Sequence, residues 1–169
     1  MIAQAFGCAL AASPLELPAG GAADGQGANA VTQAAVQQGI MTCAARINHV
    51  TNFLGYAPPM GVLLMVPPTL PDQHLVPLAM EAPLGSTDGL AYVSATFAPN
   101  QANGCGAAYE AVVYWPTPCD AVQVRQFAGL KKVGYLKTDI AVLDGGVATK
   151  VFLLPAGAGC VSIKKEMVL

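Results

Sequence analysis

The five cysteines are the side chains of this sequence with the most reactive chemistry. They are spread over a chain of 169 residues, at Cys8, Cys43, Cys105, Cys119 and Cys160. No two of them form a Cys-x-x-Cys pair. That spacing argues against a zinc ribbon and against a thioredoxin-type redox site. Two interpretations remain: two disulfides with one leftover thiol in an oxidising compartment, or five buried thiols in a cytosolic protein. We favour the first.

The reach of each cysteine limits which pairs can form. A strand between Cys105 and Cys119 spans about 25 Å, whereas a disulfide needs Cα atoms within about 7 Å. These two are therefore not expected to pair. Cys119, at the start of a predicted helix, can meet Cys160, at the start of a predicted strand, and we expect this disulfide. Cys105 can then pair with Cys43 or with Cys8.

Cys105 is also a candidate nucleophile, because it lies between two glycines in a turn. The segment from Gln101 to Gly106 resembles, over these few residues, the nucleophile loop of papain-like proteases. The resemblance implies a thiol-dependent hydrolase or transferase. Such enzymes place a histidine after the cysteine, because the thiol needs a base, whereas His49 and His74 both precede Cys105 here. The fold would have to bring His74 close, and we favour a disulfide cysteine in a tight turn.

The remaining polar side chains predict neither a metal site nor a cofactor. His49 and His74 are not at ligand spacing from each other or from a cysteine or an acid, and a zinc or iron site needs three or four converging ligands. Glu81 and Glu110 could meet on neighbouring strands as a pair of glycosidase carboxylates. We interpret them instead as solvated residues, so an enzymatic function is not favoured.

Composition narrows the class of partner. Apolar residues make up 54% of the chain and charged residues 11%, with eight Lys and Arg against ten Asp and Glu. There is no basic stripe that would bind nucleic acid. No apolar run approaches the roughly 20 residues of a transmembrane helix. The expected partner is another protein or an unidentified small ligand.

The chain divides at a change of pattern near Asn29. Residues 1–28 are rich in Ala, Gly and Pro, and we interpret them as a flexible leader or the remnant of an export signal. Residues 29–169 are expected to form a single α+β domain. Apolar residues then recur at helical spacing from Asn29, a plausible N-cap, to Leu54, with Gly55 as the C-cap. This predicts a long N-terminal helix, although Gly39 disfavours its first half.

Period-two patterns predict an antiparallel sheet after this helix. A second helix is expected from Cys119 or Asp120 to about residues 130–134. The predicted strands are residues 75–82, 90–97, 108–115, 138–143, 147–154 and 160–168. The short apolar run from Val62 to Val66 leaves three or four strands open before the second helix. The fold class is therefore α+β, with a mainly antiparallel sheet of about six strands and both helices packed on one face.

Alternation along the strands predicts a second, polar face that meets solvent or a partner. The residues assigned to that face are Tyr92, Ser94, Thr96, Glu110, Tyr114, Ser162, Lys164 and Glu166. Tyr92, Glu110 and Tyr114 are the candidate binding residues, because exposed tyrosines with few charges are typical of interface centres. We expect an exported, periplasmic or secreted, binding or accessory module. The alternatives are the thiol enzyme using Cys105 and a cytosolic scaffold with reduced cysteines.

Overall fold

The structure, a computed structural model, describes residues 27–84 and 89–168. Its helices are α1 (Ala30–Gln37), α2 (Ala44–Phe53), the short 3-10 helix η1 (Pro71–Gln73) and α3 (Cys119–Gln126). Its strands are β1 (Val62–Leu64), β2 (Val76–Pro83), β3 (Leu90–Asn100), β4 (Gly104–Trp115), β5 (Lys131–Tyr135), β6 (Ala141–Asp144), β7 (Thr149–Ala156) and β8 (Gly159–Val168). The α+β class is confirmed.

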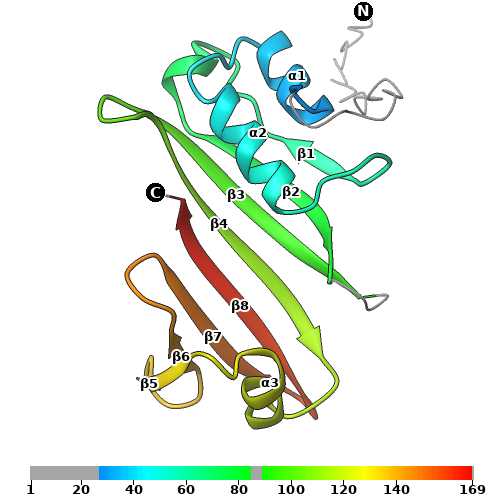
Figure 1. The fold of residues 1–169 in the computed structure, drawn as a ribbon, viewed down its shortest axis with the longest axis vertical. Helices are drawn as coiled ribbons and strands as arrows, with labels where there is room; N and C mark the ends of the chain where they lie inside the picture. The colour runs from blue at the N-terminus through cyan, green and yellow to red at the C-terminus, as the bar shows by residue number, and fades with distance from the viewer. Residues whose placement is uncertain (1–26, 85–88, 169) are drawn as a thin grey trace, which may run out of the picture.

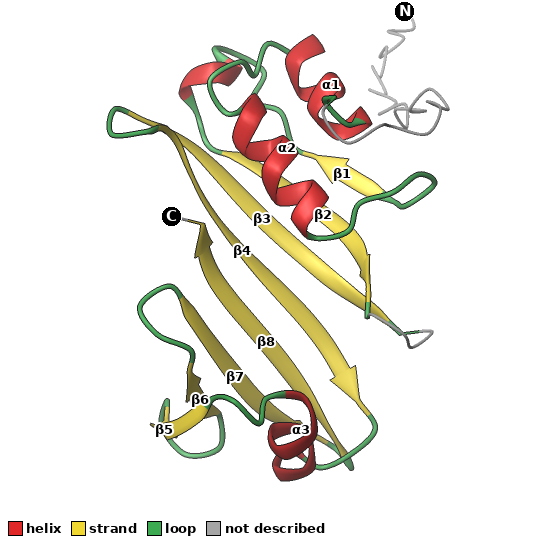
Figure 2. Cartoon of the chain, viewed as in Figure 1, coloured by secondary structure: helices red, strands yellow, loops and turns green. Residues whose placement is uncertain are grey.

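All eight strands form one antiparallel sheet in the order β1-β2-β3-β4-β8-β7-β6-β5 (Figures 1 and 2). The prediction of about six strands is therefore too low. Strand β5 lies where the sequence analysis placed the end of the second helix, because α3 already ends at Gln126. Exposure alternates along β5, but its exposed residues Lys131, Val133 and Tyr135 mix polar and apolar types, so this short edge strand has no period-two apolar pattern in the sequence. Its register also shifts between Lys132 and Gly134. The other strand beyond the six, β1, has only three residues and lies within the apolar run at residues 62–66, where a further strand was left open.

The prediction of one long N-terminal helix is wrong, because the chain forms two helices in this region, α1 and α2. Asn29 caps α1 as expected, accepting a hydrogen bond from the Thr32 N–H at 3.0 Å. Gly39 then adopts a φ of 85°, which ends the helical path and which a residue with a Cβ adopts at a cost. Helix α2 starts anew at Ala44, and Gly55, with a φ of 78°, follows its end as predicted.

Asp72 of η1 fixes the turn between these two helices. Its carboxylate accepts hydrogen bonds from the N–H groups of Met41 at 2.8 Å and Thr42 at 2.6 Å, and from the Thr42 hydroxyl at 2.8 Å. The hydrogen bond from the Thr42 N–H is the main cause that lowers the pKa of Asp72 below its ordinary value. Burial opposes this effect but does not cancel it. Because the folded-state pKa is lowered, this stabilisation is complete at neutral pH and is lost as the pH falls through the acid range.

Asp72→Ala is expected to lower the free energy of unfolding by about 1 kcal/mol at neutral pH, as the loss of a helix cap does. Urea unfolding at pH 7 and again near pH 3 measures the difference from the wild type. The difference should shrink at the lower pH, because the carboxyl of Asp72 is protonated in the unfolded chain before it is protonated in the folded protein, where its pKa is lowered. Asp139→Ala, in an exposed loop, is the control. A difference that stays the same at both pH values would contradict this role.

The three α-helices cover one face of the sheet, as predicted. Helices α1 and α2 lie over β1–β4, and α3 lies over the other end, against β7 and β8 (Figure 1). Two cores result, the larger containing Ile47 and Phe97 and the smaller containing Val122 and Leu153. We call this side of the sheet the helix face and the opposite side the open face.

The two halves of the chain have the same architecture. Helix α2 is followed by the meander β1–β4 and α3 by the meander β5–β8, and their last strands, β4 and β8, pair in the middle of the sheet. A disulfide occupies the same place in each half. Cys43, which precedes α2, joins Cys105, the second residue of β4; Cys119, which begins α3, joins Cys160, the second residue of β8. An approximate twofold axis, perpendicular to the sheet, therefore relates the halves.

The strand register shows where this axis passes. Glu110 and Lys165 lie equally far along β4 and β8 when each is counted from the cysteine of its own strand, Cys105 or Cys160. The same two residues are directly opposite each other in the β4–β8 pair. Each β4–β8 residue pair on one side of Glu110 and Lys165 therefore corresponds to a β4–β8 pair on the other side. The axis runs between Glu110 and Lys165.

Candidate functional site: the open face of the sheet

The open face carries one row of side chains from each strand, and none of the helices among residues 27–84 and 89–168 lies on it. Its central residues are Tyr92, Ser94 and Thr96 of β3, Ala108, Glu110, Val112 and Tyr114 of β4, Val161, Ile163, Lys165 and Met167 of β8, and Lys150, Phe152 and Leu154 of β7. Val112, Ile163 and Phe152 form a row across these strands and are only half-buried. Apolar side chains in the middle of the sheet are thus within reach of solvent.

The three predicted binding residues surround Val112 on this face. Tyr92 is directly opposite Val112, and Glu110 and Tyr114 lie two residues to either side of it along β4. Tyr92 and Tyr114 are 55% and 60% exposed. A Cβ on Gly159 would lie 2.6 Å from the Tyr114 hydroxyl, so the ring of Tyr114 rests on the backbone of this glycine. The placement agrees with the sequence analysis, whereas a binding role stays a prediction.

A groove of about 310 Å³ opens on the same face, over β3, β4, β8 and β7. Its lining includes Ser94, Thr96 and Ala108 on one side and Val147, Phe152 and Met167 on the other. Glu110 and Lys165 lie between these two sides and also line it. The groove therefore follows the seam between the two halves of the chain.

Glu110 and Lys165 form an ion pair across the seam, with 2.6 Å between the Lys165 Nζ and the Glu110 Oε1. Their side chains are 43% and 55% exposed. An exposed pair of this kind contributes at most about 1 kcal/mol to folding. Their charges are consequently available to a binding partner, and substitutions at them should leave the fold intact. Lys165 is not among the predicted binding residues, because its position opposite Glu110 depends on the strand register.

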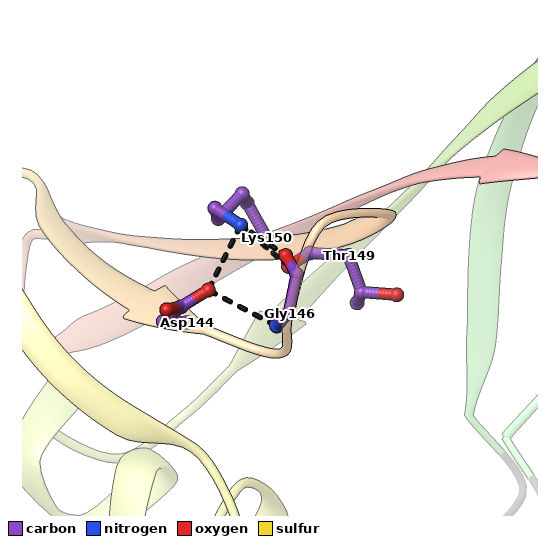
Figure 3. Close-up of polar contacts among 4 residues, drawn as sticks. All are labelled: Asp144, Gly146, Thr149 and Lys150. Carbon is purple, nitrogen blue, oxygen red and sulfur yellow. Dashed lines mark hydrogen bonds and ion pairs between the residues drawn. The ribbon is translucent and has the colours of Figure 1, made fainter.

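The turn between β6 and β7 forms one wall of the groove and is held by polar contacts (Figure 3). Asp144 accepts a hydrogen bond from the Gly146 N–H at 3.0 Å and pairs with Lys150 at 2.8 Å, while Lys150 also donates to the Gly146 carbonyl. The bond from Lys150, followed by that from Gly146, holds the pKa of Asp144 below its ordinary value. The tip of this turn presents Val147, whose side chain is 86% exposed.

The prediction that Ser162, Lys164 and Glu166 lie on the polar face is wrong. In the β4–β8 register these residues lie on the helix face, opposite Val113, Ala111 and Tyr109. They occupy the central strip between the two cores, where polar side chains are paired with each other. The Trp115 indole N–H, for example, donates to the Ser162 hydroxyl at 2.8 Å. The alternation of β8 therefore has the opposite sense to the one expected.

A polar cluster of Tyr109, Lys164 and Glu166 lies in this strip. The Tyr109 hydroxyl donates to Glu166 at 2.9 Å and accepts from Lys164 at 3.0 Å, and Lys164 pairs with Glu166 at 2.5 Å. Burial raises the pKa of Tyr109 above its ordinary value. Burial alone would also raise the pKa of Glu166, but the hydrogen bonds from Lys164 and Tyr109 outweigh it and keep that pKa low. A neutral tyrosine between paired charges suits a structural role, since each polar group already has its partner.

The comparisons with known proteins give no family for this chain. No family model, curated protein or solved structure matches it. A function can therefore be argued only from the geometry of the chain itself.

The cysteines are paired as the sequence analysis favoured. Cys119 bonds to Cys160, and Cys105 bonds to Cys43, one of its two expected partners. Cys8 lies outside the described residues. In its disulfide Cys105 has no thiol for catalysis. The histidine that lines the polar hollow of about 210 Å³ beside Cys105 is His49, and not His74, which the thiol-enzyme hypothesis requires.

Two further properties bear on the kind of site. Within the described ranges, no three side chains of His, Cys, Asp or Glu gather closely enough to hold a metal ion. None of the helices found there has the length and apolarity needed to cross a bilayer. The open face, with its groove and its central charges, is the candidate site that geometry supports best.

Proposed function

We propose that this protein is an exported binding or assembly module that captures its partner with the open face. The observation that supports this most directly is the row of half-buried apolar side chains, Val112, Ile163 and Phe152, beside a groove with charges at its centre. A sheet usually buries an apolar face against another layer. Exposed apolar patches of this kind are common at interaction sites.

The two disulfides are compatible with an extracytoplasmic location, where such bonds persist. They also reduce the support for the other two functions. A thiol enzyme would need Cys105 reduced, and a cytosolic scaffold would need all the cysteines reduced. A periplasmic or secreted accessory factor needs neither change.

A photo-crosslinking amino acid tests the face directly. Placed at Tyr114, it should give a covalent adduct in cells that produce the protein, and the adduct should decrease strongly when Glu110→Lys is added. Phe53, 63% exposed on α2, is the matched position on the other side of the sheet and should give none of this adduct. Circular dichroism of the Glu110→Lys variant checks that the fold is kept. The absence of an adduct at Tyr114, or one unaffected by Glu110→Lys, would remove the proposed binding face.

A further inference from the structure

The two sides of the groove differ in the size of their side chains. The β3–β4 side carries small residues, Ser94, Thr96 and Ala108. The β7–β8 side carries large apolar residues, with Val147 projecting from the β6–β7 turn. The carbonyl of Ala148 accepts a hydrogen bond from the Met167 N–H at 2.9 Å, so this turn is fixed to the sheet. One side of the groove thus offers a hollow and the other a projection.

The two sides of the groove also differ in the sign of their central charge. Glu110 is on the β3–β4 side and Lys165 is on the β7–β8 side. A second copy of the groove, turned by 180° about an axis parallel to β4 and β8, would place each side over the opposite side of the first. Shape and charge would then match at the same time.

We propose that the open face binds the open face of a second copy of this chain, related by a twofold axis that runs along the groove between the two sheets. In this arrangement Glu110 of each copy faces Lys165 of the other, and Val147 enters the hollow lined by Thr96 and Ala108. This inference rests on the proposed function, because it names the partner of the same face. A twofold interface of this kind is self-complementary, as the commonest dimers are.

The size of the face agrees with this partner. Four strands lie around the seam, β3 and β4 on one side and β8 and β7 on the other, and each has at least eight residues. With strands about 4.8 Å apart and about 3.3 Å per residue, they cover about 500 Å² per copy. Two copies would bury about 1,000 Å², which is about the least that a specific protein interface buries. Sheets stack in this way in β-sandwiches.

Reversing the central charges tests the twofold arrangement. Glu110→Lys alone and Lys165→Glu alone should each weaken the dimer, raising its dissociation constant by about tenfold or more, because each puts like charges opposite each other. An equimolar mixture of the two variants should dimerise again, since both facing pairs between the two different chains would then join a lysine to a glutamate. Sedimentation velocity of the two variants, their mixture and the wild type measures this.

A second pair of variants separates association from folding. Val147→Asp should also raise the dissociation constant about tenfold, because it places a charge in the hollow of the other copy. Val124→Asp is the matched control, since Val124 is 71% exposed on α3 on the helix face, and it should leave the dimer unchanged. Far-ultraviolet circular dichroism should be the same for all of these variants.

The outcomes distinguish this inference from the proposed function. A wild type that stays monomeric up to about 100 µM, or a dimer that none of the three single variants weakens, overturns the inference. If the monomer nevertheless gives an adduct with another molecule at Tyr114 that Glu110→Lys removes, the binding face stands with a different partner. If the monomer gives no adduct, both proposals fail.

Discussion

Replacing Cys43 and Cys105 with alanine is expected to lower the free energy of unfolding by about 4 kcal/mol, and replacing Cys119 and Cys160 by nearly as much. The reason lies in the unfolded chain. The two disulfides join residues 62 and 41 positions apart, and each cross-link removes conformational freedom that the unfolded chain would otherwise have. Alanine leaves no unpaired polar group in the core.

Urea unfolding of the two double variants beside the wild type measures these effects. Each variant is the control for the other, because the disulfides lie in different halves of the chain. Thiol alkylation with an intact-mass measurement on the wild type should first show four protected cysteines and one reactive thiol. Unchanged midpoints in both variants would contradict the stabilising role, and five reactive thiols would contradict the disulfides themselves.

Phe97→Ala is expected to lower the free energy of unfolding by about 3–5 kcal/mol. Phe97 lies on the helix face of β3, has no exposed surface and belongs to the larger core. Its removal loses the transfer free energy of the ring and leaves a cavity that a sheet fixed by hydrogen bonds on both sides can fill only in part.

Phe53→Ala makes the same deletion at an exposed position. Phe53 is 63% exposed, and its ring lies 6.3 Å from that of Tyr109. Aromatic pairs are worth about 0.5–1.5 kcal/mol beyond their buried area, so a loss of that order is expected. Thermal or urea unfolding of both variants makes the comparison. Equal losses would mean that the larger core is not the main source of stability in this half.

The parts of the fold that could be predicted are those decided by neighbouring residues. Asn29 caps its helix through Thr32, three residues away, and Gly55 adopts the left-handed conformation where the apolar periodicity stops. The break between α1 and α2 depends in part on Asp72, which is about thirty residues from the N–H groups it binds. The distant partner explains why the sequence analysis could place Gly39 as a weak point but not as an end.

For the candidate site too, only the features that depend on neighbouring residues could be predicted. Alternation correctly placed Tyr92, Glu110 and Tyr114 on one exposed face, since period two is a local property. The neighbours of Glu110 depend on how β8 pairs with β4, and no local pattern gives that register. Polar residues in the middle of the helix face also reversed the expected sense of β8. A weak signal for the repeated halves was present in the Gly-Cys pairs that begin β4 and β8, at Cys105 and Cys160.

The approximate twofold axis has a consequence for how the two halves can differ. Tyr109 and Lys164 occupy equivalent positions in β4 and β8, counted from the cysteine of each strand. Two identical subunits meeting at this seam would have the same side chain at both positions, and they would need a sufficient protein concentration to meet at all. Joining the halves in one chain makes their association independent of concentration. It also allows the two equivalent positions to carry different groups, the hydroxyl of Tyr109 in one half and the ammonium of Lys164 in the other. The hydrogen bond between Tyr109 and Lys164 is therefore a contact that an exactly symmetric assembly could not make.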